Sequence, residues 1–188
     1  MLTATYSLVA IRAEQDKAHR LLSRLQQYIQ SGWQSLRNLD FAVLESAFNK
    51  MLHFDNYCRC RKVELYLIPA IRRVTREADT LLAELEALSA AGAEMIRLAR
   101  SRLADVFEVG SAAAHEACRS IDQYCFSLQA RLRKEDAELF PMARRVLSVE
   151  EWFSVAAQFL SDDGGGGQHR RHAPPFHRAD GDIGRPRP

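Results

Sequence analysis

The chain has 188 residues, 47% of them hydrophobic and 27% charged, which is typical of one globular domain with an ample core. Its formal net charge of +2 gives no argument for nucleic-acid binding, and no apolar run reaches the roughly 18 residues of a membrane helix. Four cysteines in so long a chain are not typical of a disulfide framework, and the first residues do not resemble a signal peptide. We therefore expect a cytoplasmic protein with free thiols.

Most of the chain carries the pattern of amphipathic helices. Apolar residues recur at spacings of three and four, which place them on one helix face. The pattern predicts four long helices, over residues 3–30, 41–73, 76–107 and 112–139. Gly32 and Gly110 separate neighbouring helices at two of the junctions. Within the second helix, Asp55–Asn56 indicates a local kink or break, and Pro69 indicates a distortion or a nearby helix end.

The last part of the chain is of two kinds. Ser148 and Glu151 have the spacing of a capping box, which predicts a short fifth helix through about Phe159. Four glycines and a segment without apolar periodicity follow Asp163, a composition typical of disorder. We therefore expect an all-α protein. Residues 1–163 should form an antiparallel up-down-up-down four-helix bundle with a short fifth helix, and residues 164–188 a disordered tail.

Two segments repeat a motif that could carry chemistry. In one, Cys60 is followed four positions later by Glu64 and then by an apolar run that ends in Pro69. In the other, Arg131 precedes Glu135 by the same spacing, before a second proline. Positions i and i+4 lie on one helix face, so each pair points at the same spot. Two antiparallel helices that aim such pairs inward are typical of carboxylate-bridged metal centres, in which the usual partner of the glutamate is histidine.

Longer segments around these glutamates are similar to the hemerythrin-like family, also called HHE cation-binding domains. EDAELFP at 135–141, followed by LSVEEW, resembles the fourth-helix motif of that family, and ELYLIP at 64–69 resembles its second-helix motif. AEQDKAHRLLSRL at 13–25 is similar to its first helix, and the resemblance extends from about residue 7 to about residue 159. The resemblance implies a bundle that holds two iron ions through histidines and carboxylates. It also implies a role in binding oxygen, nitric oxide or iron, or in sensing iron or redox state.

The residues that match the family's metal ligands are altered here. The carboxylate positions are kept as Glu64 and Glu135. The histidine positions of the four helices fall, in chain order, on Gln15, Cys60, Ser89 and Arg131. Neutral imidazole is a preferred iron ligand, so two glutamates and a thiolate form a much poorer di-iron site.

Two interpretations of the altered site stay open. In the first, the guanidinium of Arg131 pairs with Glu64 and Glu135 where a cation once lay, although Arg131 could instead extend to solvent. The metal site is then vestigial, and the protein is a binding or regulatory module for a protein partner or a second copy of itself. In the second interpretation, Glu64, Glu135 and Cys60 hold a single iron or zinc ion.

An enzymatic role is not expected from the sequence. No serine or cysteine has a histidine placed to activate it as a nucleophile. Peroxide chemistry at Cys60 would need a lowered thiol pKa, which the neighbouring Arg59, Arg61 and Lys62 could supply. The alternative for Cys60 is a small buried side chain without a chemical role.

Overall fold

A computed structural model of the chain describes residues 2–33 and 41–169. Every regular element within these residues is helical, as the sequence predicts. The elements in chain order are α1 (Leu2–Trp33), α2 (Phe41–Arg59), η2 (Val63–Leu67), α3 (Ile68–Val74), α4 (Asp79–Val109), α5 (Ser111–Lys134), η3 (Glu135–Leu139), α6 (Phe140–Val146) and α7 (Val149–His169). None of the described helices is long and apolar enough to cross a membrane.

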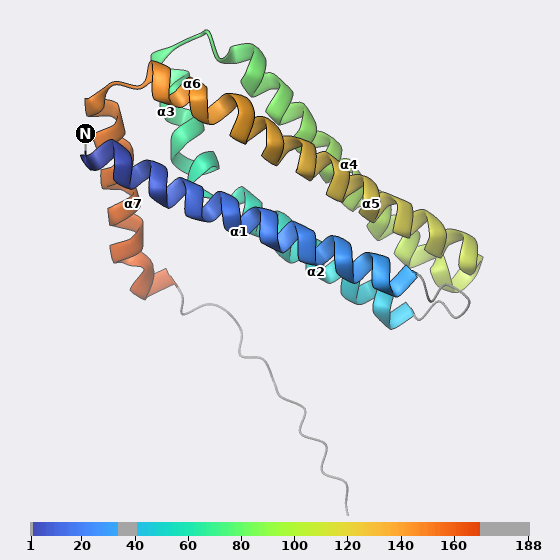
Figure 1. The fold of residues 1–188 in the computed structure, drawn as a ribbon. Helices are drawn as coiled ribbons and strands as arrows, with labels where there is room; N and C mark the ends of the chain where they lie inside the picture. Colours follow the sequence, from blue (N-terminus) through green and yellow to red (C-terminus); the bar gives the residue numbers. More distant parts are fainter. Residues whose placement is uncertain (1, 34–40, 170–188) are drawn as a thin grey trace, which may run out of the picture.

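The long helices lie in two pairs (Figure 1). The first pair is α1 with α2, and the second is α4 with α5, which the chain joins through the single residue Gly110. The backbone reverses there because Gly110 has φ of 75°, a conformation that glycine adopts without strain. Helix α1 also contacts α5 and α7, and α7 lies across the first part of α1 (Figure 1). The two pairs therefore share one interior, because α1 contacts both its partner α2 and α5 of the other pair.

Two short π-helical segments interrupt the long helices, each just before a proline. Proline has no amide hydrogen, and its ring clashes with the carbonyl four residues back in a regular helix. In η2 and η3 the residue before the proline instead bonds five residues back, from the N–H of Ile68 to the oxygen of Val63 and from that of Phe140 to Glu135. The wider turn accommodates the proline ring, and the chain continues as α3 and α6. The distortion expected at Pro69 is thus confirmed.

Of the kink or break expected at Asp55–Asn56, the break is wrong. Helix α2 continues through these residues, and Asp55 is held on its surface by Arg59, whose Nε donates to Oδ2 at 2.8 Å. The helix instead ends at Arg59, and a turn over Cys60–Arg61 leads into η2. Because this turn interrupts the helical period, it changes which residue of the segment points inward.

Helix α7 begins at the predicted capping box. The Ser148 amide donates to Glu151 Oε2 at 2.7 Å, and the Glu151 amide donates to Ser148 Oγ at 3.3 Å. Its inner face buries Trp152 and Phe159 against the core. The helix extends to His169, past the boundary that the glycine run predicts after Asp163. The remaining part of the predicted tail, residues 170–188, lies outside the described residues.

The buried apolar side chains form two clusters along the molecule. One contains the second half of α1, α2 and the facing parts of α4 and α5, and the other surrounds η2, α3, η3, α6 and α7. On α1 the clusters are separated at Gln15, which lies between Ile11 of one and Ala18 of the other. Along α5 and η3 the clusters are separated at Glu135, which lies between Leu132 of one and Leu139 of the other. A buried polar layer therefore divides the core.

Candidate functional site

The centre of the polar layer is an ion pair between Arg61 and Glu135. Arg61 Nη2 lies 2.7 Å from Glu135 Oε1, and Nη1 lies 2.9 Å from Oε2, so the pair is bidentate. The side chains are 1% and 0% exposed. The turn after α2 and the first residue of η3 bring these residues together across the core. Two parallel charge-assisted hydrogen bonds fix the carboxylate plane as well as its charge.

A second arginine extends the pair into a network of four charges. Arg131 Nε donates to Glu135 Oε1 at 3.0 Å, and Nη2 donates to Glu64 Oε1. Both contacts expected of Arg131 are therefore present, and its side chain is 10% exposed and does not extend to solvent. Glu64 is 24% exposed and lies 3.6 Å from Arg61 Nη2 as well. Two guanidinium cations thus match two carboxylates, and the network has no net charge.

Gln15 connects this network to the helix backbone. Its Oε1 accepts a hydrogen bond from Arg61 Nη1 at 2.6 Å, and its Nε2 donates to the carbonyl of Leu132 at 3.1 Å. The amide is 0% exposed, so both of its polar ends are satisfied within the protein. Gln15 therefore serves as a neutral bridge between the arginine and α5.

The pKa values of the two carboxylates shift in opposite directions. Burial by itself would raise the pKa of Glu135, but Arg61 and Arg131 more than offset it, so the pKa is lowered from the ordinary value. Burial raises the pKa of Glu64, and Arg131 opposes this rise only in part. The ionised form of Glu135 therefore stabilises the fold above the unfolded pKa of the carboxyl, and this contribution is lost as the pH falls through the lower folded value.

The residues predicted to hold a single metal ion do not come together. Glu64 and Glu135 lie in one network, but Cys60 is exposed to solvent, because the turn after α2 points Arg61 inward in its place. No group of three His, Cys, Asp or Glu side chains among the described residues is placed to hold a metal ion. Both oxygens of Glu135 and Oε1 of Glu64 are already bonded by guanidinium groups, which repel a cation. As these side chains are placed in the structure, they do not form a donor set that fits iron or zinc.

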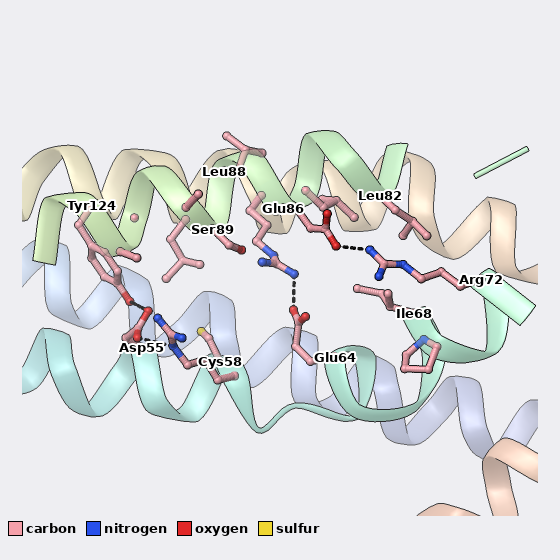
Figure 2. A pocket seen from close by; sticks show the side chains of 18 residues that line it. Asp55, Cys58, Glu64, Ile68, Arg72, Leu82, Glu86, Leu88, Ser89 and Tyr124 are labelled. Atoms are coloured by element: carbon pink, nitrogen blue, oxygen red, sulfur yellow. Dashed lines mark hydrogen bonds and ion pairs between the residues drawn. The ribbon is translucent and has the colours of Figure 1, made fainter. Parts of the chain in front are cut away.

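A cavity of about 580 Å³ opens beside the network, between α2, η2 and α3 on one side and α4 on the other (Figure 2). Glu64 and Arg131 form part of its wall. Ser89 of α4 lines the same cavity, and its buried hydroxyl has no hydrogen-bond partner among the described residues. Three of the predicted ligand positions thus line one cavity, whereas Gln15 and Glu135 lie fully buried in the polar layer.

Arg61 is the site residue that the sequence analysis missed. A repeat at an offset of 72 residues, from Arg59 to Arg131, could have drawn attention to it. The residue types that recur at this offset are those of Arg59, Arg61, Lys62, Leu67, Pro69, Arg72, Arg73 and Val74. The π-helical segments and the helices after them follow the same offset. In this register Glu135 is equivalent to Val63 and not to Glu64, which explains why only one of the two glutamates is fully buried.

The four thiols should differ sharply in reactivity. Burial raises the pKa of Cys58 and Cys125 to about 12 and that of Cys118 to about 11, whereas Cys60 is exposed. Because the thiolate is the reactive form, a thiol reagent such as iodoacetamide should label one cysteine per native chain at pH 8. Mass spectrometry of the labelled peptides should locate it at Cys60, and Cys60→Ser should abolish the fast reaction. A second thiol that reacts at a similar rate in the native protein would contradict this prediction.

Comparison of the chain with protein-family models, with curated proteins and with solved structures finds no match.

Proposed function

We propose that the chain is a hemerythrin-like four-helix bundle in which arginine side chains have replaced the metal centre, and that it serves as a binding or regulatory module and not as an enzyme. In this proposal α1, α2, α4 and α5 are the four helices of an antiparallel bundle. The observation that carries the proposal is the network of Arg61, Arg131, Glu135 and Glu64, which contains both glutamates that match the family's carboxylate ligands in the resemblance.

The charge balance of this network supports the proposal. A di-iron centre supplies positive charge that ionised glutamates neutralise, and here two guanidinium groups supply positive charge at the same carboxylates. Removing the cationic partner of a buried carboxylate is strongly destabilising. Once the metal is lost, the arginines are therefore needed to neutralise the glutamates. The network therefore accounts for the survival of the glutamates without histidine ligands.

The proposed role follows from what the site offers. The four side chains of the network include no thiol or hydroxyl that could act as a nucleophile, and Arg61 and Glu135 are held in structural bonds. The remaining feature is the cavity beside Glu64 and Arg131, which is a place for binding. A regulatory role requires in addition a protein partner or a second copy of the chain. We propose a cytoplasmic location, in keeping with four free cysteines.

Metal analysis tests this proposal directly. Protein purified without a histidine tag should contain well under one iron or zinc ion per chain by mass spectrometry of the elements. Replacing both Arg61 and Arg131 with histidine removes the fixed charges and adds two imidazole ligands beside the glutamates, so zinc affinity should rise at least tenfold. Arg133→His is the matched control, because Arg133 is exposed and occupies the position of Arg61 in the repeat.

The competing interpretation predicts the opposite starting point. With a working site on Cys60 and the two glutamates, the wild type would contain about one metal ion per chain, and Cys60→Ala would abolish it. That result would overturn the proposed function. Metal in the wild type that is unaffected by Cys60→Ala would also overturn it, since the site would then lie elsewhere.

A further inference from the structure

The cavity beside the network is internally neutral. Its wall contains three cationic and three anionic side chains, and each cation pairs with an anion of the same wall (Figure 2). The pairs are Arg59 with Asp55, Arg72 with Glu86, and Arg131 with Glu64. A charged ligand would lose its hydration and find no unpaired counterion, which is costly. The wall therefore favours a ligand without net charge.

Most of the rest of the wall is apolar. Leu82 and Leu88 of α4 line it from one side, and Ile68 of α3 lines it from the other (Figure 2). Leu85 of α4 also lines the cavity. The volume of about 580 Å³ lies within the range of small-molecule sites, which are mostly apolar with a few placed polar groups. A ligand that fills this space would bury an aliphatic or aromatic body against the leucines.

Unused hydrogen-bonding atoms in this wall identify the polar end of such a ligand. The buried Ser89 hydroxyl has no partner among the described residues, and a hydroxyl both donates and accepts. Within the same part of the chain, no bond is found for Arg131 Nη1 or for Glu64 Oε2. Figure 2 shows Ser89 and Glu64 on facing walls, with the guanidinium that bonds Glu64 between them. Donors and an acceptor thus remain available together at one place.

We propose that this cavity binds a neutral amphipathic small molecule whose polar head is a carboxamide or a similar group that both accepts and donates hydrogen bonds. The head carbonyl accepts from Ser89 and Arg131, and its N–H donates to Glu64. The apolar body lies against the leucines of α4. This inference rests on the proposed binding role of the module and names the class of its ligand.

Three matched probes test the proposal: 4-phenylbutanamide, 4-phenylbutanoate and 4-phenylbutylamine, titrated by calorimetry into the full chain at pH 7. They share one apolar body and differ in the charge of the head. The amide should bind at least tenfold more tightly than either ion. Equal or tighter binding of an ion would overturn the neutral-ligand proposal, and so would the absence of binding by all three.

Two substitutions on α4 locate the binding site. Ser89→Ala removes the unpartnered hydroxyl and should weaken binding of the amide about tenfold, while leaving the melting temperature close to that of the wild type. Ser101→Ala is the matched control, because Ser101 is exposed on the same helix and lies outside the cavity wall. Equal binding by the wild type and Ser89→Ala would contradict the assignment of the head group.

The two proposals fail separately. If no probe binds but the wild type remains free of metal, the ligand class is wrong and the replaced metal centre stands. If the wild type holds stoichiometric metal, the proposed function is wrong whatever the probes do.

Discussion

Replacing Arg61 with alanine is expected to lower the free energy of unfolding by about 3–5 kcal/mol. The change would leave Glu135, which is 0% exposed, with only a single bond to Arg131, and would remove the partner of Gln15 Oε1. A core carboxylate that loses its bidentate partner is one of the few mechanisms that produce losses of this size. Urea unfolding followed by far-ultraviolet circular dichroism at pH 7 would measure the loss.

Two variants serve as controls for this result. Arg133→Ala removes an arginine at the equivalent repeat position, but Arg133 is exposed, so the change should stay within about 0.5 kcal/mol. Replacing Arg61 with methionine and Glu135 with leucine together should recover most of the loss, since an apolar pair needs no partner. A loss below about 1 kcal/mol in Arg61→Ala would show that water or rearrangement satisfies Glu135. The network would then not exclude solvent from the carboxylate.

Arg131→Ala is expected to cost less, about 2–3 kcal/mol of unfolding free energy. Glu135 keeps its bidentate bond to Arg61 in this variant, and Glu64 is 24% exposed and can gain water. Because burial raises the pKa of Glu64, the carboxyl can also take up a proton once its cation is gone. The same urea titration, repeated at pH 5 and pH 7, would measure both effects.

The coupling between these residues provides a control for the second prediction. Adding Glu64→Gln to Arg131→Ala removes the stranded charge, so the double variant should be less destabilised than the sum of the single changes. Additive effects of Arg131→Ala and Glu64→Gln would mean that the two side chains do not stabilise each other.

The wild type should lose stability as the pH falls through the lowered pKa of Glu135, whereas the Arg61→Met, Glu135→Leu variant should lack this part of the acid loss.

The helical content of the protein could be predicted from local pattern alone. Apolar spacing along the first, third and fourth segments predicts α1, α4 and α5 within a few residues, and the capping box locates the start of α7. Such signals depend on neighbours within one helical turn, and no distant residue is needed to detect them. Glu135 falls in line with the apolar residues of its segment, so its burial was predictable for the same reason. A buried carboxylate must in turn be paired, protonated or bound to metal.

The identity of the inward-facing residue after α2 required the tertiary structure. The i, i+4 rule places Cys60 with Glu64, but that rule assumes an unbroken helix. The turn over Cys60–Arg61 and the wider π-helical segment after it shift the register, so that Arg61 points into the core and Cys60 points to solvent. Local propensity does not encode this choice.

The sequence by itself determined that the chain is helical. It also predicted that the two motif glutamates lie on one site, and that the histidine positions of the resemblance hold Gln15, Cys60, Ser89 and Arg131 instead. Only the tertiary structure decided how the carboxylates are neutralised. The pairing of Arg61 with Glu135 joins residues 74 positions apart, and Gln15 of α1 accepts a further hydrogen bond from Arg61. The cavity beside Ser89 likewise depends on how α4 packs against α2 and α3. Contacts between distant segments determine both the ion-pair network and the cavity. Their geometry depends on how the helices pack, on the turn after α2 and on the two π-helical segments.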